Sequence, residues 1–134
     1  DRVIIHMEDC VDWPVVFLAC LYKNIVPLPL ATSMGPDLFW KIADFVECST
    51  VISGNDQIPK LGLRLPVISR TDIQEYYISQ PTVSEPVFVD PDAESWMNIS
   101  SGSTGMPKVA VHRHQSMGPI YRNRDLNCKI ILLN

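Results

Sequence analysis

Nine consecutive residues, 100–108, combine the residue types that hold phosphate groups, and they read SSGSTGMPK. Glycines let a backbone turn sharply and approach a ligand closely. Successive backbone N–H groups in such a loop form a concave nest for anionic oxygens. The serine and threonine hydroxyls can donate hydrogen bonds to the same oxygens, and Lys108 adds a compact positive charge. The segment therefore predicts a loop that binds a polyphosphate.

The spacing of the glycines separates this loop from other glycine-rich segments. The nucleoside-triphosphatase loop requires GxxxxGK[ST], whereas Gly102 and Gly105 are three residues apart and Lys108 follows a proline. The dinucleotide pattern GxGxxG does not fit either. A flexible Ser/Gly linker is the remaining alternative. It is disfavoured because β-branched strand patterns flank the loop, at residues 95–99 and 108–112.

The elements that must position the loop alternate between strand and helix patterns. Strands are expected at 2–7, 25–30, 50–53 and 65–69, and helices at 11–22, 35–46 and 71–78. This alternation predicts an α/β fold with a partial, mostly parallel sheet and flanking helices. Residues 80–94 are rich in proline and acids and are expected to be an exposed connection.

Several local features refine this expectation. The helix at 11–22 is apolar nearly all round, which predicts burial on most sides, with Asp9 or Asp12 as its N-cap and Asn24 as a left-handed C-cap. Pro27 and Pro29 lack N–H donors on the same side of their strand, which predicts an incomplete ladder there. The second helix has one apolar stripe, formed by Leu38, Phe39, Ile42, Phe45 and Val46.

The composition excludes some classes of function. A net charge of −4 argues against a nucleic-acid partner. No apolar run reaches the ~20 residues needed to span a bilayer. The four cysteines form no CxxC pair, and Cys20 and Cys48 lie in apolar helical patterns. Reduced thiols in a cytoplasmic protein are therefore expected. His6 and the three tryptophans, Trp13, Trp40 and Trp96, are interpreted as packing residues. For Trp96, which precedes the loop, fixing the base of the loop is an open alternative.

Residues 100–114 resemble the signature of the adenylate-forming, AMP-binding superfamily, which includes acyl- and aryl-CoA ligases. The signature is (T/S)SGSTGxPKG followed by an apolar strand and an HxH ending, here VAVHRH at 109–114. The sequence VDWP at 11–14 and the Ser-Ser-Gly start of the loop are most similar to benzoate-type CoA ligases. Val109 stands where a glycine usually follows the lysine, so crowding of the strand start or a shifted loop is expected.

The resemblance implies an ATP-dependent acid–CoA ligase. A carboxylic acid, with an aromatic acid suggested by the benzoate-type features, would attack ATP to give an acyl-adenylate and pyrophosphate. Coenzyme A would then take the acyl group, and Mg²⁺ would bridge the phosphates. The resemblance assigns His114 to the substrate pocket and Ser100, Ser101, Gly102, Ser103, Thr104, Gly105 and Lys108 to the ATP-binding loop. Within the loop, Ser101, Ser103, Thr104 and Lys108 would contact the phosphates, and Gly102 and Gly105 would shape the nest.

The resemblance also implies an amino-terminal fragment, with residues 1–117 belonging to the AMP-binding domain and 118–134 forming an unmatched tail. The family's adenine-binding segment and its late catalytic lysine find no match in this sequence. No catalytic residue and no metal site are therefore assigned, and these residues alone are expected not to catalyse adenylation. The alternative is a non-catalytic nucleotide- or protein-binding remnant of the fold, which Val109 and the tail favour.

Overall fold

The structure is a computed structural model that describes residues 1–62, 64–79, 85, 87–100 and 107–116. Strands and helices alternate along the first part of the chain, and a strand pair follows. The elements are β1 (Arg2–His6), α1 (Asp12–Tyr22), β2 (Val26–Pro29), α2 (Pro36–Phe45), β3 (Thr50–Ser53), α3 (Ile58–Leu61), β4 (Val67–Ser69), α4 (Arg70–Ser79), β5 (Glu94–Ser100) and β6 (Lys108–Arg113).

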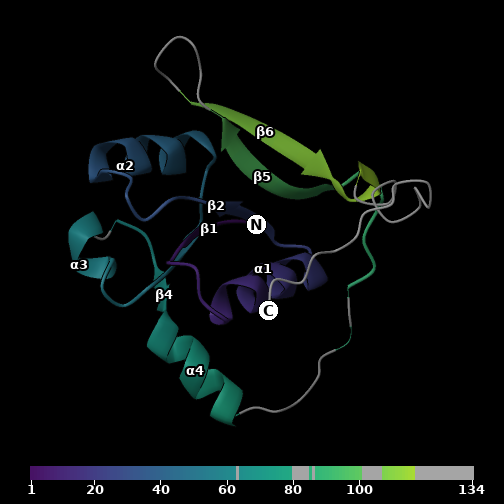
Figure 1. Cartoon of the computed structure of the whole chain (residues 1–134). Helices are drawn as coiled ribbons and strands as arrows, with labels where there is room; N and C mark the ends of the chain where they lie inside the picture. The colour runs from purple at the N-terminus through teal and green to yellow at the C-terminus, as the bar shows by residue number, and fades with distance from the viewer. Residues whose placement is uncertain (63, 80–84, 86, 101–106, 117–134) are drawn as a thin grey trace, which may run out of the picture.

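The first four strands form a parallel sheet in the order β2-β1-β3-β4 (Figure 1). Ile4 in the central strand β1 is paired with Leu28 on one side and Val51 on the other. Strands β5 and β6 form a separate antiparallel pair. The expected α/β fold with a mostly parallel sheet and flanking helices is confirmed.

Strand β2 is an edge strand of the parallel sheet, and the missing N–H donors of its prolines lie on its unpaired side. The N–H groups of Val26 and Leu30 donate to the carbonyls of Asp1 and Ile5, each at 2.9 Å. Backbone N–H groups of successive residues point to opposite sides of a strand. The N–H groups of Val26 and Leu30 point to β1, so the positions of Pro27 and Pro29 that lack an N–H face away from β1. The expected incomplete ladder is confirmed, and the β5–β6 pair lies beside β2 instead (Figure 1).

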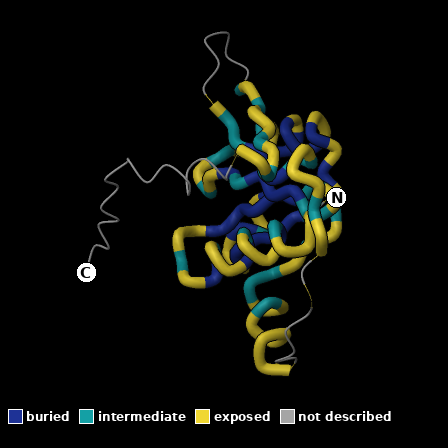
Figure 2. The backbone as a smooth tube through the Cα atoms, turned by 90° about the vertical axis from the view of Figure 1, so that its right-hand side faces the viewer, coloured by how far each residue is buried: buried dark blue, intermediate teal, exposed yellow. Residues whose placement is uncertain are grey.

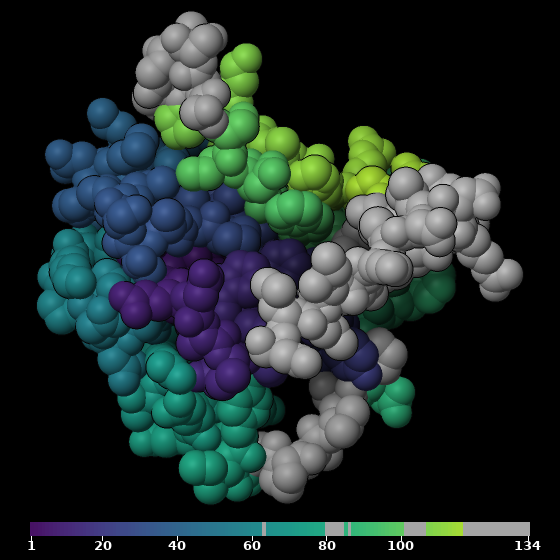
Figure 3. All heavy atoms as spheres, in the orientation of Figure 1, coloured from purple at the N-terminus to yellow at the C-terminus, as the bar shows by residue number. Residues whose placement is uncertain are grey.

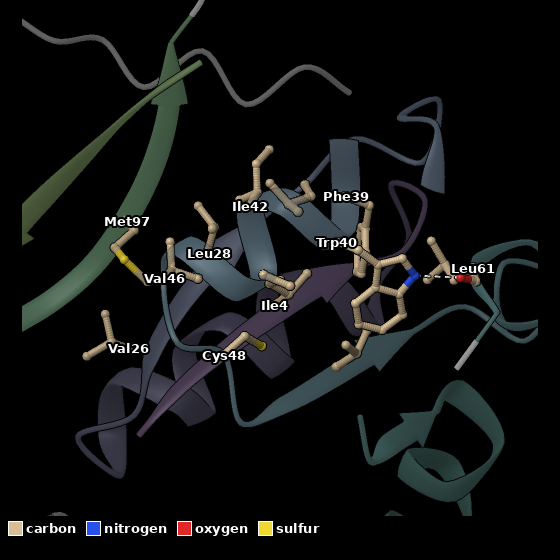
Figure 4. Close-up of a cluster of buried hydrophobic side chains, with 13 residues drawn as sticks. Ile4, Val26, Leu28, Phe39, Trp40, Ile42, Val46, Cys48, Leu61 and Met97 are labelled. Atoms are coloured by element: carbon tan, nitrogen blue, oxygen red, sulfur yellow. Dashed lines mark hydrogen bonds between the residues drawn. The ribbon is translucent and has the colours of Figure 1, made fainter. Parts of the chain in front are cut away.

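Each face of the sheet has its own core. The α2-side core (Figure 4) consists of Ile4, Val26, Leu28, Leu30, Phe39, Trp40, Ile42, Ala43, Val46, Cys48, Val51, Leu61 and Met97. The α1-side core consists of Val3, Ile5, Met7, Val16, Cys20 and Ile52. In the α2-side core, the indole Nε1 of Trp40 donates to the carbonyl of Leu61 at 2.6 Å. Helices α1 and α2 therefore cover opposite faces of the sheet.

Helix α1 is buried on one side only, so the expectation of burial on most sides is wrong. Val16 and Cys20 face the sheet, whereas Val11 is 78% exposed and Leu18 61% exposed. The reason is that α4, the other helix on this face, buries none of its residues and projects away from the sheet (Figure 2). The sequence shows that the helix is apolar on most sides, but not how many other elements pack against it.

The expected N-cap of α1 is also wrong, whereas its C-cap is confirmed. Val11 occupies the N-cap position without a side-chain cap. The Asp12 carboxylate instead accepts a hydrogen bond from Arg70 Nε at 2.6 Å, which ties α1 to the start of α4. At the other end, Asn24 has φ of 55°, the left-handed conformation expected of it.

Two features of the α2 side differ from expectation. Phe45 is 76% exposed although it was placed on the apolar stripe of α2. The buried face of the helix is turned toward Trp40 and Ala43 and away from Phe45. The short helix α3 was not predicted, since four residues are too few to show a periodicity.

Burial affects the chemistry of the thiols. Cys20 and Cys48 are buried and free, as expected, and burial raises the pKa of the Cys20 thiol to about 11. Cys128 lies outside the described residues. Within the described part of the chain, no helix is long and apolar enough to cross a membrane.

His6 is packed into the core, as expected. Its exposed fraction is 1%, its Nδ1 lies 3.3 Å from the carbonyl oxygen of Leu30, and its ring meets that of Phe39 edge-on at 5.0 Å. Burial lowers the pKa of His6 below its usual 6.5, and Lys60 lowers it further while Leu30 and Asp56 raise it. The charged imidazolium is therefore disfavoured in the folded state.

The lowered pKa of His6 predicts a loss of stability in mild acid. Below pH about 6.5 the unfolded chain takes up a proton that the folded chain resists. The free energy of unfolding should then fall by up to about 1.4 kcal/mol per pH unit until the folded pKa is reached, and the contribution should be complete above pH 6.5. Urea unfolding of the wild type and His6→Gln between pH 5 and 7.5 measures it. Equal slopes for the two proteins below pH 6.5 would contradict the prediction.

Candidate functional site

The candidate phosphate loop joins β5 to β6. The two strands are antiparallel, and the last pair of their ladder is Ser100 opposite Lys108. The structure thus brings the first and last residues of the loop together at the end of a hairpin. The five site residues between them, Ser101, Gly102, Ser103, Thr104 and Gly105, lie outside the described residues.

The two faces of the hairpin differ in character. Opposed residues on antiparallel strands share a face, and every second residue returns to it. One face therefore carries three pairs: Trp96 with His112, Asn98 with Ala110, and Ser100 with Lys108. The opposite face carries Met97 with Val111 and Ile99 with Val109. Lys108 and Ser100 thus share a face with an aromatic pair deeper in the hairpin.

Val109 is accommodated by the strand that it begins. It is paired with Ile99, and both side chains pack against the α2-side core. A β-branched residue suits a half-buried strand position. The expected crowding of the strand start is therefore not observed, because β6 begins at Lys108 with Val109 in regular register.

The hairpin is attached to the parallel sheet at its base by an ion pair. Arg2 in β1 donates to Glu94 at the start of β5, with Nη2 2.9 and 3.0 Å from the carboxylate oxygens and Nε at 3.2 Å. Arg2 Nη1 also donates to the carbonyl of Val46 at 3.3 Å. Sequence reading placed Glu94 on a solvated linker face, since a partner 92 residues away leaves no local signal.

The hairpin is packed against the rest of the molecule on both faces. The side chain of Met97 is 1% exposed and belongs to the α2-side core. On the other face, the Trp96 ring meets the ring of Phe17 in α1 at 5.9 Å. Figure 3 shows the green β5–β6 residues lying against the blue residues of α2.

His114 lies beyond the end of β6 that is remote from Lys108. Its backbone N–H donates to the carbonyl of Ala93 at 3.1 Å. Its ring Nε2 is buried and has no hydrogen-bond partner among the described residues. The neighbouring His112 points its Nε2 at Asn98 Oδ1 at 3.4 Å. In the described ranges, no three His, Cys, Asp or Glu side chains gather as a metal site would need.

A cleft opens at the carboxyl ends of β1 and β2, where parallel α/β sheets commonly bind ligands. Its volume is about 480 Å³. Trp13 forms part of its wall and stacks on Phe17, with ring centroids 5.3 Å apart. Sequence reading did not single out this cleft, whose lining is Met7, Glu8, Asp9, Trp13, Pro29, Leu30, Ala31, Thr32 and Ser33.

The sequence matches the AMP-binding enzyme family over residues 1–129. The chain belongs to this family. The match includes both strands of the hairpin and the loop between them. It also extends beyond residue 117, where the resemblance read from the sequence ended.

Benzoate-type CoA ligases are among the curated relatives of this AMP-binding chain. It is 26% identical over 131 residues to the 4-hydroxybenzoate–CoA/benzoate–CoA ligase of Rhodopseudomonas palustris, covering 87% of this chain and 24% of the relative. It is 27% identical over 133 residues to the 3-hydroxybenzoate–CoA/4-hydroxybenzoate–CoA ligase of Thauera aromatica, covering 87% and 25%. The chain thus spans about a quarter of the length of these relatives.

Solved structures share the fold. The N-terminal subdomain of Klebsiella oxytoca NpsA superposes with a TM-score of 0.76 at 23% identity, covering 90% of this chain and 30% of that one. A Mycobacterium tuberculosis fatty acyl CoA synthetase superposes with a TM-score of 0.75 at 23% identity, covering 88% and 25%. The AMP-binding chain therefore has the fold of part of the amino-terminal domain of adenylate-forming enzymes.

Proposed function

We propose that this AMP-binding chain supplies the ATP phosphate-binding loop of an ATP-dependent acid–CoA ligase. In that reaction a carboxylate attacks the α-phosphate of ATP, pyrophosphate leaves, and the thiol of coenzyme A then takes the acyl group from the adenylate. The observation that supports the proposal is the pairing of Ser100 with Lys108, which closes the loop on a packed hairpin. In this position the Lys108 ammonium would offset the charge that develops on the departing phosphates.

Mg²⁺ would enter this site together with the nucleotide. Mg²⁺ is usually held by substrate phosphates and water with one or two carboxylates, rather than by a cage of protein ligands. A loop of hydroxyls and backbone N–H groups fits that mode of binding, since it contacts the phosphates and leaves their remaining oxygens for the metal. The bound ion would screen the phosphate charge alongside Lys108.

We further propose an aromatic carboxylic acid as the substrate. The support comes from the curated relatives, whose names specify benzoate and hydroxybenzoates. The buried Nε2 of His114, which has no partner among the described residues, is available to a polar group of such an acid. A cytoplasmic location belongs to the same proposal, because Cys20 and Cys48 are free thiols in the core.

The loop is tested by removing the lysine. Lys108→Ala should weaken the binding of Mg·ATP by about tenfold or more, because a charge-assisted contact to phosphate contributes about 1.5–3 kcal/mol. Titration followed by the amide shifts of β5 and β6 measures the affinity. Lys41→Ala, an exposed lysine on α2, is the matched control and should bind like the wild type. Equal affinities for Lys108→Ala and Lys41→Ala would remove the loop from the proposal.

A non-catalytic nucleotide- or protein-binding remnant is the second candidate. Its support is the valine at position 109 in place of the family's glycine. A protein-binding remnant would not bind Mg·ATP. A ligase and a nucleotide-binding remnant both would, so binding does not separate these two. They differ in the exchange of pyrophosphate into ATP by the protein at its full encoded length, which depends on an aromatic acid for a ligase and is absent for a remnant.

A further inference from the structure

Four rings connect the hairpin to helix α1. The imidazole of His112 stacks on the indole of Trp96, with centroids 4.2 Å apart and planes 10° from parallel. The Trp96 ring also meets the ring of Phe17, at an interplanar angle of 73°. Phe17 in turn stacks on Trp13 at 8°. The rings form a continuous path from β6 through β5 into the first turns of α1.

A neighbouring residue of the hairpin, Asn98, contacts the stacked His112–Trp96 pair. The Nε2 atom of His112 lies 3.4 Å from Oδ1 of Asn98, so the imidazole is held on the side of the hairpin that carries Asn98. Asn98 occupies the next position along the same face, and Ser100 and Lys108 follow it. The stack and the base of the phosphate loop are therefore successive parts of one surface, separated by four strand residues or roughly 13 Å.

The hairpin needs contacts on both faces to hold its loop in place. A two-stranded ribbon alone is marginally stable, and here Met97 and Ile99 fix one face through the α2-side core. On the opposite face of the hairpin, the Trp96 ring contacts the ring of Phe17 in α1. A tilt of about 5° about the stack would displace Lys108 by about 1 Å at that distance. A misplacement of this size can cost orders of magnitude where charged groups must meet.

We propose that Trp96 is a positioning residue for the phosphate loop: its indole, held between His112 and Phe17, sets the tilt of the hairpin and hence the place of Lys108. The inference rests on the proposed function, because it assumes that the loop binds phosphates. Trp96 acts on the loop through the strand and touches no part of the nucleotide. It should therefore affect a bare polyphosphate and ATP equally.

The experiment compares three variants with the wild type at a temperature where all are folded, as checked by far-UV circular dichroism. Trp96→Leu removes the aromatic contact, and Trp96→Phe keeps a ring in its place. Trp40→Leu is the matched control, because Trp40 is a buried indole of the α2-side core outside the hairpin. The affinities for Mg·ATP and for magnesium tripolyphosphate are measured by titration calorimetry.

We expect Trp96→Leu to weaken the binding of both ligands by a similar factor of about ten, because Lys108 would be displaced from the phosphates. Trp96→Phe should recover most of the affinity, and Trp40→Leu should lower the unfolding temperature without changing either affinity. The inference is overturned if Trp96→Leu binds like Trp40→Leu, if Trp96→Phe is as weak as Trp96→Leu, or if only ATP binding is weakened. Wild-type protein that binds neither ligand would contradict the proposed function, and the inference with it.

Discussion

Phe39→Ala is expected to lower the free energy of unfolding by about 4 kcal/mol, a large part of the stability of a domain this size. The Phe39 side chain is completely buried in the α2-side core. Its ring meets the Trp40 ring edge-on at 5.1 Å and the His6 ring at 5.0 Å. Truncation would leave a cavity between two rigid aromatic neighbours, which cannot collapse to fill it.

The same helix offers a matched control for this prediction. Phe45 is 76% exposed near the end of α2. Phe45→Ala should change the free energy of unfolding by less than about 0.5 kcal/mol, as is usual at surface positions. Urea unfolding followed by circular dichroism measures both variants. Similar losses for the two substitutions would mean that the α2 face is packed differently from the structure.

Met97→Ala is expected to cost about 3 kcal/mol and to loosen the hairpin in particular. Met97 is 1% exposed and belongs to the same core as Leu28, so it joins β5 to the edge of the parallel sheet. Without it, Ile99 and Val109 alone would hold this face of the hairpin. Hydrogen exchange of the β5 and β6 amides should therefore accelerate more than that of β1 and β3.

Val111→Ala is the control for Met97→Ala, since Val111 stands opposite Met97 in the strand ladder but is 46% exposed. It should cost less than about 1 kcal/mol and leave the pattern of hydrogen exchange unchanged. Uniform acceleration across all strands in Met97→Ala would contradict the special link between this side chain and the hairpin.

Much of the parallel sheet was predictable because its strands are short β-branched runs between turn residues. Strand β3 was placed at its observed bounds, and the prolines of β2 predicted that one side of that strand lacks a full ladder. The burial of α1 was not predictable, because an apolar sequence does not reveal that α4 projects away from the sheet. The ion pair of Arg2 with Glu94 depends on a contact between distant segments, which local pattern does not encode.

The sequence predicts which residues form the candidate phosphate loop, but not how the strands around it are paired. Two strand patterns predicted that strands flank residues 100–108, but not that these strands pair with each other in an antiparallel hairpin with Ser100 opposite Lys108. The stacking of Trp96 on His112 could not be predicted, because it depends on the register in which β5 and β6 pair. That register depends on how many residues form the turn between β5 and β6. A shift of one residue would move every side chain of the shifted strand to the other face.

The two prolines of β2 also bear on how the chain is made. All pairings of the four-stranded sheet join residues 2–69, so this sheet can be completed while the hairpin is still being synthesised. During that interval the edge of β2 is not yet covered by the β5–β6 hairpin. An edge that lacks N–H donors at Pro27 and Pro29 is a poor template for a foreign strand. The same two prolines thus make the edge of β2 a poor site for pairing with another chain before the hairpin is formed.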